Sequence, residues 1–187
     1  MGFDSIKKLV FKITPSRLIR FYQKPLVKSI KDLPKFAKLS YSQEGEDLIL
    51  ERYFDNKKNG FYVDVGAHHP KRFSNTYIFY LKGWQGINID AMPGSMIAFK
   101  NERPKDINLE LGVSKQQKEM VYYMFNQPAI NTFSVHEAKK KEAIERFKII
   151  DKKTIKTLPL KLILEEFLPE DTVIDFMTID VEGLDLE

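Results

Sequence analysis

Apolar positions along this chain of 187 residues switch between two kinds of spacing. Short runs rich in β-branched and aromatic residues are typical of buried strands, whereas apolar residues that recur every three or four positions are typical of one face of a helix. Strand-like runs lie at 61–65, 87–90, 107–111, 120–125 and 172–179. Helix-like stretches lie at 42–54, 76–82, 93–100, 137–147 and 160–167, with Ser42 as the predicted cap of the first and Ser74 or Asn75 as that of the second.

This alternation predicts an α/β fold, in which a largely parallel sheet carries helices on both faces. Ligands of such sheets bind at the carboxyl ends of the strands. Three acids occupy or follow such ends: Asp64 within 61–65, Asp90 after the second strand, and Asp180 after the last one. We therefore expect the functional site at the edge of the sheet where these three carboxylates meet.

The N-terminal segment differs from the rest of the chain, so we predict an arm over 1–39 and one domain over 40–187. Residues 1–40 carry ten Lys or Arg against two Asp, a net charge of +8, and because the whole chain carries +4, residues 41–187 carry −4. The arm has the pattern of a basic amphipathic helix. Such a helix either lies on an anionic membrane surface or packs on protein, and the sequence leaves both open. The apolar residues at helical spacing are Ile6, Leu9, Val10 and Ile13.

Composition excludes several classes of protein. The positive charge belongs to the arm and not to the domain, which argues against a nucleic-acid-binding fold. The sequence has no apolar run of about 18 residues and no signal-peptide pattern at its start. Without cysteine it forms no disulfide and no thiolate metal site, which suits a reducing cytoplasm. We expect a cytoplasmic protein, with contact of residues 1–36 with the inner membrane face as an open alternative.

The segment after the first strand contains one glycine, Gly66, where dinucleotide-binding loops contain three. The second glycine of that pattern lets the backbone approach a pyrophosphate, and His68 occupies its position here. A nicotinamide dinucleotide is therefore disfavoured. Asp90 follows Gly66 by 24 positions, close to the spacing of the acid that binds a ribose in such folds. A nucleoside cofactor without phosphates, such as S-adenosylmethionine, fits one close backbone approach and two nearby carboxylates.

Several motifs, in order along the chain, resemble the FkbM-type methyltransferases. They are YSQEGEDLIL (41–50), VDVGAHHP (63–70), SNT (74–76), GWQGINID (83–90), NTFS (131–134) and IDFMTIDVEGLDLE (174–187). The resemblance covers about 40–187 and implies a Rossmann-like class I methyltransferase sheet that uses S-adenosylmethionine, often to methylate a hydroxyl of a sugar or a polyketide. One departure is Ala91, because the family often has proline after the ribose acid.

The resemblance also implies roles for individual residues. Asp64, Gly66 and Ala67 would line the methionine side of the cofactor. Asp90 would hold the ribose, and the loop from Glu110 to Ser114 would lie near the adenine.

The acids after the last strand are candidates for catalysis. Methyl transfer to a hydroxyl requires the oxygen to be positioned in line and its proton to be removed. Asp180, Glu182, His68 and His69 are able to do this, although His69 followed by Pro70 also fits a simple turn. A carboxylate pair is also able to bind a divalent ion, but we favour direct acid–base chemistry because no further metal-ligand spacing is apparent.

The chain ends at Glu187, where this family continues through a further helix and strands. We therefore expect a sheet that is incomplete at its C-terminal end, with 172–179 as an apolar edge strand that a second copy or another partner chain could cover. The expected substrate is a small molecule or a glycan. The alternative to an enzyme is a truncated, non-catalytic binding module with a membrane-associating arm.

Overall fold

The computed structural model describes residues 35–55 and 57–181, and the chain divides into two compact units, Met1–Leu39 and Ser40–Glu187. Of the first unit, residues 35–39 are described and form neither helix nor strand. The predicted helix of the arm lies outside the described residues. None of the described helices combines the length and the apolar character that crossing a membrane requires.

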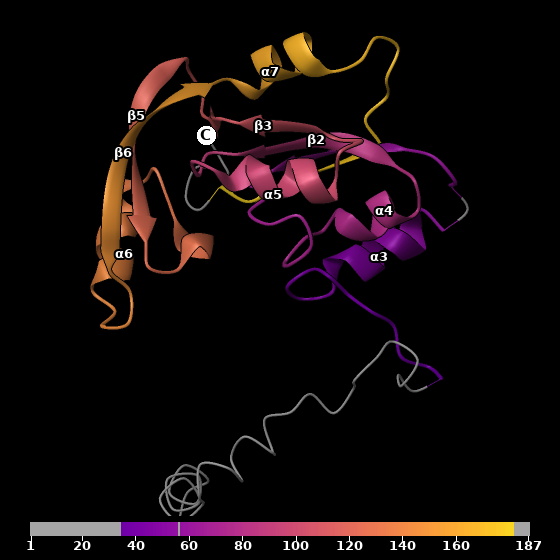
Figure 1. Ribbon diagram of the computed structural model, residues 1–187, viewed down its shortest axis with the longest axis horizontal. Helices are drawn as coiled ribbons and strands as arrows, with labels where there is room; N and C mark the ends of the chain where they lie inside the picture. The colour runs from indigo at the N-terminus through magenta and orange to yellow at the C-terminus, as the bar shows by residue number, and fades with distance from the viewer. Residues whose placement is uncertain (1–34, 56, 182–187) are drawn as a thin grey trace, which may run out of the picture. The chain divides into compact units, whose positions relative to one another are not determined.

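The main sheet of the second unit has four strands, all paired in parallel, and their order is β3-β2-β1-β7 (Figure 1). They are β1 (Phe61–Val65), β2 (Gln85–Asp90), β3 (Ile107–Glu110) and β7 (Phe176–Ile179). The prediction of an α/β fold with a largely parallel sheet is confirmed. The last strand begins at Phe176 and not at residue 172, and it is an edge strand of the described sheet.

Helices cover both faces of this sheet. On one face, Val63 of β1 and Ile87 of β2 pack against Ile163 of α7 (Leu160–Phe167). On the other face, Tyr62 and Trp84 join the core beneath α3 (Glu46–Tyr53) and α4 (Tyr77–Leu81), beside α5 (Ser95–Glu102). The two cores arise because successive side chains of a strand point to opposite faces. Figure 1 shows α7 on the opposite side of the strands from α3, α4 and α5.

The first described helix begins later than the sequence predicted. Its cap is Gly45, with φ of 92°, and the Ser42 hydroxyl instead donates to the Asp47 carboxylate (2.8 Å) and accepts from the Gly45 N–H (3.0 Å). The Asp47 carboxylate also accepts from Tyr41 N–H and Ser40 Oγ, both at 2.7 Å. This buried acid fixes the segment that precedes the helix, so the chain turns once more before the helix starts.

A second, three-stranded sheet was only partly anticipated. Its order is β4-β6-β5, and β5 and β6 pair in antiparallel fashion. The strands are β4 (Gly112–Val113), β5 (Lys118–Phe125) and β6 (Ile149–Leu158), and η2 (Pro128–Ile130) and α6 (Val135–Glu142) lie between the last two. The sequence predicted β5 but not β6, because the lysines and the largely exposed surface of IIDKKTIKTL hide the apolar pattern of a strand.

Candidate functional site

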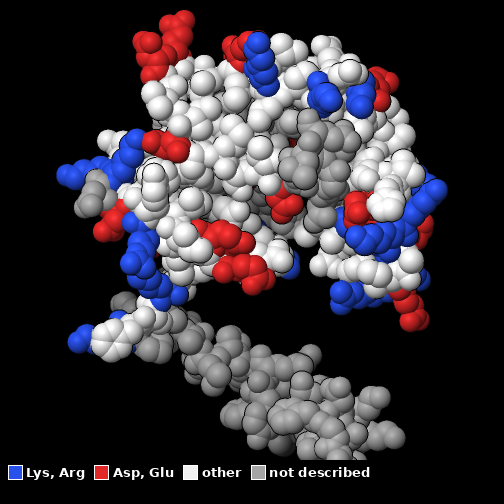
Figure 2. Space-filling view, turned by 180° about the vertical axis from the view of Figure 1, so that it is seen from behind, with Lys and Arg blue, Asp and Glu red and all other residues white. Residues whose placement is uncertain are grey.

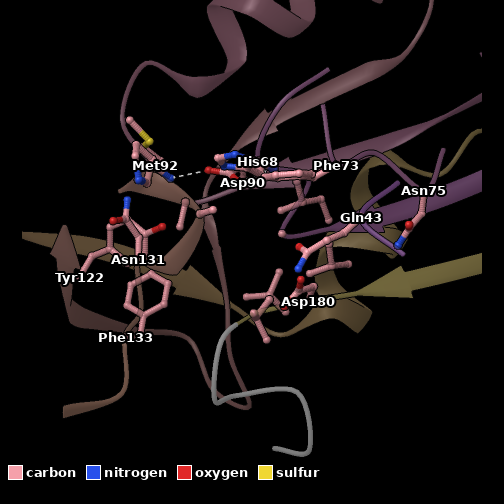
Figure 3. Close-up of a pocket in the computed structure, with 18 of the residues that line it drawn as sticks. Gln43, His68, Phe73, Asn75, Asp90, Met92, Tyr122, Asn131, Phe133 and Asp180 are labelled. Atoms are coloured by element: carbon pink, nitrogen blue, oxygen red, sulfur yellow. Dashed lines mark hydrogen bonds between the residues drawn. The ribbon is translucent and has the colours of Figure 1, made fainter. Parts of the chain in front are cut away.

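A cavity of about 300 Å³ opens at the carboxyl ends of the parallel strands, and residues of the second sheet form its far wall (Figure 3). The residues that line it come from the loop before α3, from the segments after β1, β2, β3 and β7, and from the NTFS motif. It lies at the edge where the sequence predicted the site.

Asp90 ends β2 and lies on the cavity wall, with 8% of its surface exposed. Its Oδ2 accepts from the His68 N–H (2.8 Å) and its Oδ1 from the Met92 N–H (2.7 Å), the second of which Figure 3 shows. Burial raises the pKa of Asp90, and these two hydrogen bonds oppose that shift. Because each carboxylate oxygen has a second lone pair, the fixed group is still able to accept from two neighbouring hydroxyls.

Gly66 also lies on the cavity wall, and its contact with the chain after β7 explains why it is glycine. Its φ is +83°, and a Cβ at this position would lie 1.8 Å from the Asp180 carbonyl oxygen. The chain after β7 passes this close because the Asp180 N–H donates to the Val65 carbonyl (2.9 Å). The single glycine therefore lets the ends of β1 and β7 converge beneath the cavity.

The two histidines after Gly66 have different environments. His68 is half-buried on the cavity wall, and burial lowers its pKa although the nearby Asp90 acts in the opposite direction. It is therefore neutral at pH 7 and able to accept a proton. His69 is exposed, and its Nδ1 accepts from the N–H groups of Lys71 (3.1 Å) and Arg72 (3.0 Å). The contacts of His69 form a turn, which the sequence offered as the alternative to a catalytic role.

Asp180 is exposed and lines the cavity just beyond β7, on the same side as Gln43 in Figure 3. Glu182, the other predicted catalytic acid, lies outside the described residues. The structure thus brings Asp180 and His68 to one cavity from two strands that are far apart in sequence.

Four of the six residues predicted to contact the cofactor do not line the cavity, and Asp64 and Ala67 are two of them. Asp64 is buried, its Oδ2 accepts from the Thr76 hydroxyl (2.6 Å), and burial raises its pKa to about 6. Ala67 packs against Met96 and Phe99. Alternation along β1 turns Asp64 towards the helices on the face of Tyr62, and Ala67 comes to that side after the left-handed turn at Gly66. Contact of either with a cofactor stays a prediction.

In the predicted adenine loop, the first and last residues do not line the cavity, whereas two residues between them do. Glu110 is exposed at the end of β3. Ser114 is buried, its Oγ donates to the Gln116 carbonyl (2.8 Å), and it lies 2.7 Å from the Thr157 hydroxyl, so it joins β4 to β6. The residues between them that line the cavity are Leu111 and Val113.

Comparison with family models gives a match to the methyltransferase FkbM domain over residues 64–187. The chain belongs to the FkbM methyltransferase family. Comparison with curated proteins and with solved structures gives no match. The matched region begins within β1 and contains the other strands of the main sheet, the second sheet and most of the cavity, whereas the cavity residues Gln43, Glu44 and Glu46 precede it.

A buried network around Arg103 was not predicted from the sequence. Arg103 has no exposed surface; its Nε donates to Asp106 Oδ2 (2.8 Å) and its Nη2 donates to the hydroxyls of Tyr62 (2.7 Å) and Thr76 (3.0 Å). Thr76 in turn donates to Asp64. The network holds Asp64 behind the cavity, and its only sequence signal is an arginine between a helix and a strand.

The second sheet and the NTFS motif supply the far wall of the cavity. Tyr122 of β5 lies against Phe133, with ring centroids 4.6 Å apart, and both line the cavity. Asn131 is also on the wall, and its Oδ1 accepts from the Phe125 N–H (2.8 Å), which fixes the turn after β5. Asn131 therefore both fixes this turn and lies at the cavity.

The charges around the cavity have one sign. Four carboxylates line it, and no lysine or arginine does so within residues 35–55 and 57–181. The carboxylates are those of Glu44, Glu46, Asp90 and Asp180. Hydrogen bonds from backbone N–H groups lower the pKa of Glu46. On the face in Figure 2, acidic side chains gather near the middle and basic ones lie mostly towards the rim. No group of His, Asp and Glu among the described residues is arranged to hold a metal ion.

Proposed function

We propose that this protein is an S-adenosylmethionine-dependent O-methyltransferase that acts on a sugar hydroxyl. The observation that carries the proposal is a cavity at the carboxyl ends of β1, β2 and β7 that combines a fixed carboxylate, Asp90, with an all-acidic set of charged groups. The strand order β3-β2-β1-β7 is also that of the first four strands of a Rossmann-type sheet, whose ligands bind where the order reverses, here between β1 and β7.

The residues of the cavity fit this cofactor. S-adenosylmethionine carries a sulfonium and an ammonium group, and carboxylates lower the cost of burying positive charge. A phosphate-bearing cofactor would meet four carboxylates and no basic side chain among the described lining residues. The apolar side chains of Leu111 and Val113 suit an adenine, and Asp90 suits the ribose diol.

The cofactor, when bound, supplies a methyl group that is open to attack by an oxygen. The chain's own part is to position the acceptor hydroxyl and to take its proton. His68 is neutral at pH 7 and half-buried on the wall, so it is able to accept that proton. Asp180 faces the same cavity and orients the acceptor by accepting a hydrogen bond from a hydroxyl next to the one that reacts. A catalytic role for Glu182, which lies outside the described residues, stays a prediction.

Isothermal titration with S-adenosylmethionine tests the proposal. Wild-type protein should bind saturably, and Asp90→Ala and Asp90→Asn should each weaken binding by at least about tenfold, because a charged hydrogen-bond acceptor is lost. Glu165→Ala is the control, since Glu165 is an exposed acid of α7 that does not line the cavity. Thermal melting monitors folding of each variant. Absence of binding by folded wild-type protein, or equal loss in the control, would contradict the proposal.

A further inference from the structure

Two aromatic side chains on the cavity wall have unusual backbone conformations. His68 has φ of 53° and Phe73 has φ of 59°, and the third such non-glycine residue in the described part of the chain is Asp171. Left-handed backbone is disfavoured for residues with large side chains, and such strain gathers at functional sites. Both aromatic residues line the cavity.

The loop that contains them is fixed at several points. The His69 ring accepts two backbone N–H groups of the turn, and the buried Arg103 donates to the Pro70 carbonyl (3.4 Å). Beyond Phe73, the Ser74 N–H donates to the Tyr41 carbonyl (3.0 Å). These contacts impose the backbone conformation of Phe73 and hold its ring at the cavity surface. The ring is only partly buried there, so burial does not explain its position.

The two rings stack on each other at the cavity. They are nearly parallel, with an angle of 19° between their planes and centroids 6.2 Å apart, and Phe73 keeps 37% of its surface exposed. The Arg72 guanidinium lies 4.3 Å from the Phe73 centroid and supports the ring. Figure 3 shows Phe73, Asn75, Gln43 and Asp180 on one side of Asp90, and Met92, Asn131 and Phe133 on the other.

Polar groups converge on the same side as Phe73. The Asn75 Nδ2 donates to Thr178 Oγ1 (3.0 Å), which fixes the amide and leaves its Oδ1 on the opposite side of the group. Gln43 and Asp180 line the same part of the cavity and offer an amide and a carboxylate. These groups are suited to hydroxyls on adjacent carbons, because they accept or donate hydrogen bonds a few ångströms apart.

We propose that Phe73 and His68 form the acceptor subsite and bind one face of an uncharged hexopyranose ring. This rests on the proposed function and specifies its substrate. The C–H groups of a sugar face carry slight positive charge and pack on the negative face of an aromatic ring. Gln43, Asn75 and Asp180 bind the hydroxyls, and His68 lies beside the one that reacts. The carboxylates of Glu44 and Asp180 repel uronic acids and phosphorylated sugars.

Saturation-transfer NMR with methyl α-glucoside and methyl α-mannoside tests this inference, with glucuronate as the anionic probe. Each is measured with and without S-adenosylmethionine, whose affinity is determined separately by titration. Wild-type protein should transfer saturation to at least one neutral glycoside and not to glucuronate. Phe73→Asn should reduce that signal at least tenfold and leave cofactor affinity within twofold, whereas Phe73→Tyr should retain the signal.

Stability separates a binding role from a structural one. Asn tolerates left-handed backbone, so Phe73→Asn should melt at the wild-type temperature or above it. Asp171→Gly, at the strained residue away from the cavity, should leave both ligands' binding unchanged. A neutral glycoside signal that survives Phe73→Asn, or cofactor binding without any glycoside signal, overturns the subsite. Glycoside binding through Phe73 without cofactor binding overturns the proposed function and leaves the subsite standing.

Discussion

At the scale of single residues, the junction between β1 and β7 depends on the absence of one side chain. Gly66 has left-handed φ and lies against the Asp180 carbonyl, and the backbone hydrogen bond from Asp180 to Val65 holds the two strand ends together there. Since Gly66 and Asp180 both line the cavity, any substitution that separates these ends also moves the cavity wall.

We expect Gly66→Ala to destabilise the fold by more than Gly94→Ala. The left-handed conformation alone costs an alanine about 1–2 kcal/mol at either position. Gly94 has the same φ of +83°, but no atom within 4 Å of the added Cβ, whereas Cβ at Gly66 would lie 1.8 Å from a carbonyl oxygen. Urea unfolding of the two variants measures the difference, and Gly66→Ala should also weaken cofactor binding. Equal losses of stability would mean that the strand ends separate at little cost.

At the scale of elements, Arg103 connects a strand, a helix and a loop that are far apart in the sequence. It follows α5 directly and bonds to Tyr62 in β1, to Thr76 at the start of α4, and to the Pro70 carbonyl in the loop that carries His68. The helices on this face are short, so the side-chain network and the aromatic core beneath it set their positions relative to the sheet.

Replacement of Arg103 by methionine should lower the free energy of unfolding by about 3–5 kcal/mol, because Asp106 would remain buried without its ionic partner. Chemical denaturation monitored by the fluorescence of Trp84 measures this. The control is Lys161→Met, which removes an exposed ion pair with Glu165 on α7 and should leave stability close to that of wild type. A small loss in Arg103→Met would mean that Asp106 is satisfied by its other hydrogen-bond donors.

At the scale of the whole molecule, the stability of the fold should depend on pH through Asp64. Burial raises its pKa to about 6 in the folded state, from 3.8 in an exposed aspartate. Between these values the folded protein keeps a proton that the unfolded chain has released. The stabilisation from Asp64 is therefore complete below about pH 4 and falls as pH rises through 6.

The size of this effect is about 3 kcal/mol, since one pKa unit corresponds to about 1.4 kcal/mol. Asp64→Asn removes the titrating group, so the stability of wild type relative to the variant should decrease between pH 4 and pH 6 and level off towards pH 7. Urea denaturation of both proteins at unit steps of pH measures the difference profile, in which contributions from the other acids cancel. A difference that is constant over this range would show that Asp64 ionises with the same pKa in both states.

Residues whose role depends on their neighbours in the sequence could be predicted, whereas residues whose role depends on distant contacts could not. Asp90 was found from its position after a buried strand, which is a local feature. His69 was resolved as a turn only by its contacts with Lys71 and Arg72. Strand β6 was missed because its lysines are exposed on a sheet with little buried surface. Arg103 was missed because its partners in the chain range from 3 to 41 positions away.

The sequence by itself determined the alternation of strands and helices, the parallel sheet, the edge at which acids gather, and the FkbM family. These features follow from local apolar spacing and from ordered motifs, both of which are visible within short windows. Only the tertiary structure decided which acids face the cavity, that β5 and the NTFS motif form its far wall, and that Phe73 lies beside His68. Those depend on pairings between distant segments and on the face to which each side chain turns, and the chain fixes both only when its core packs.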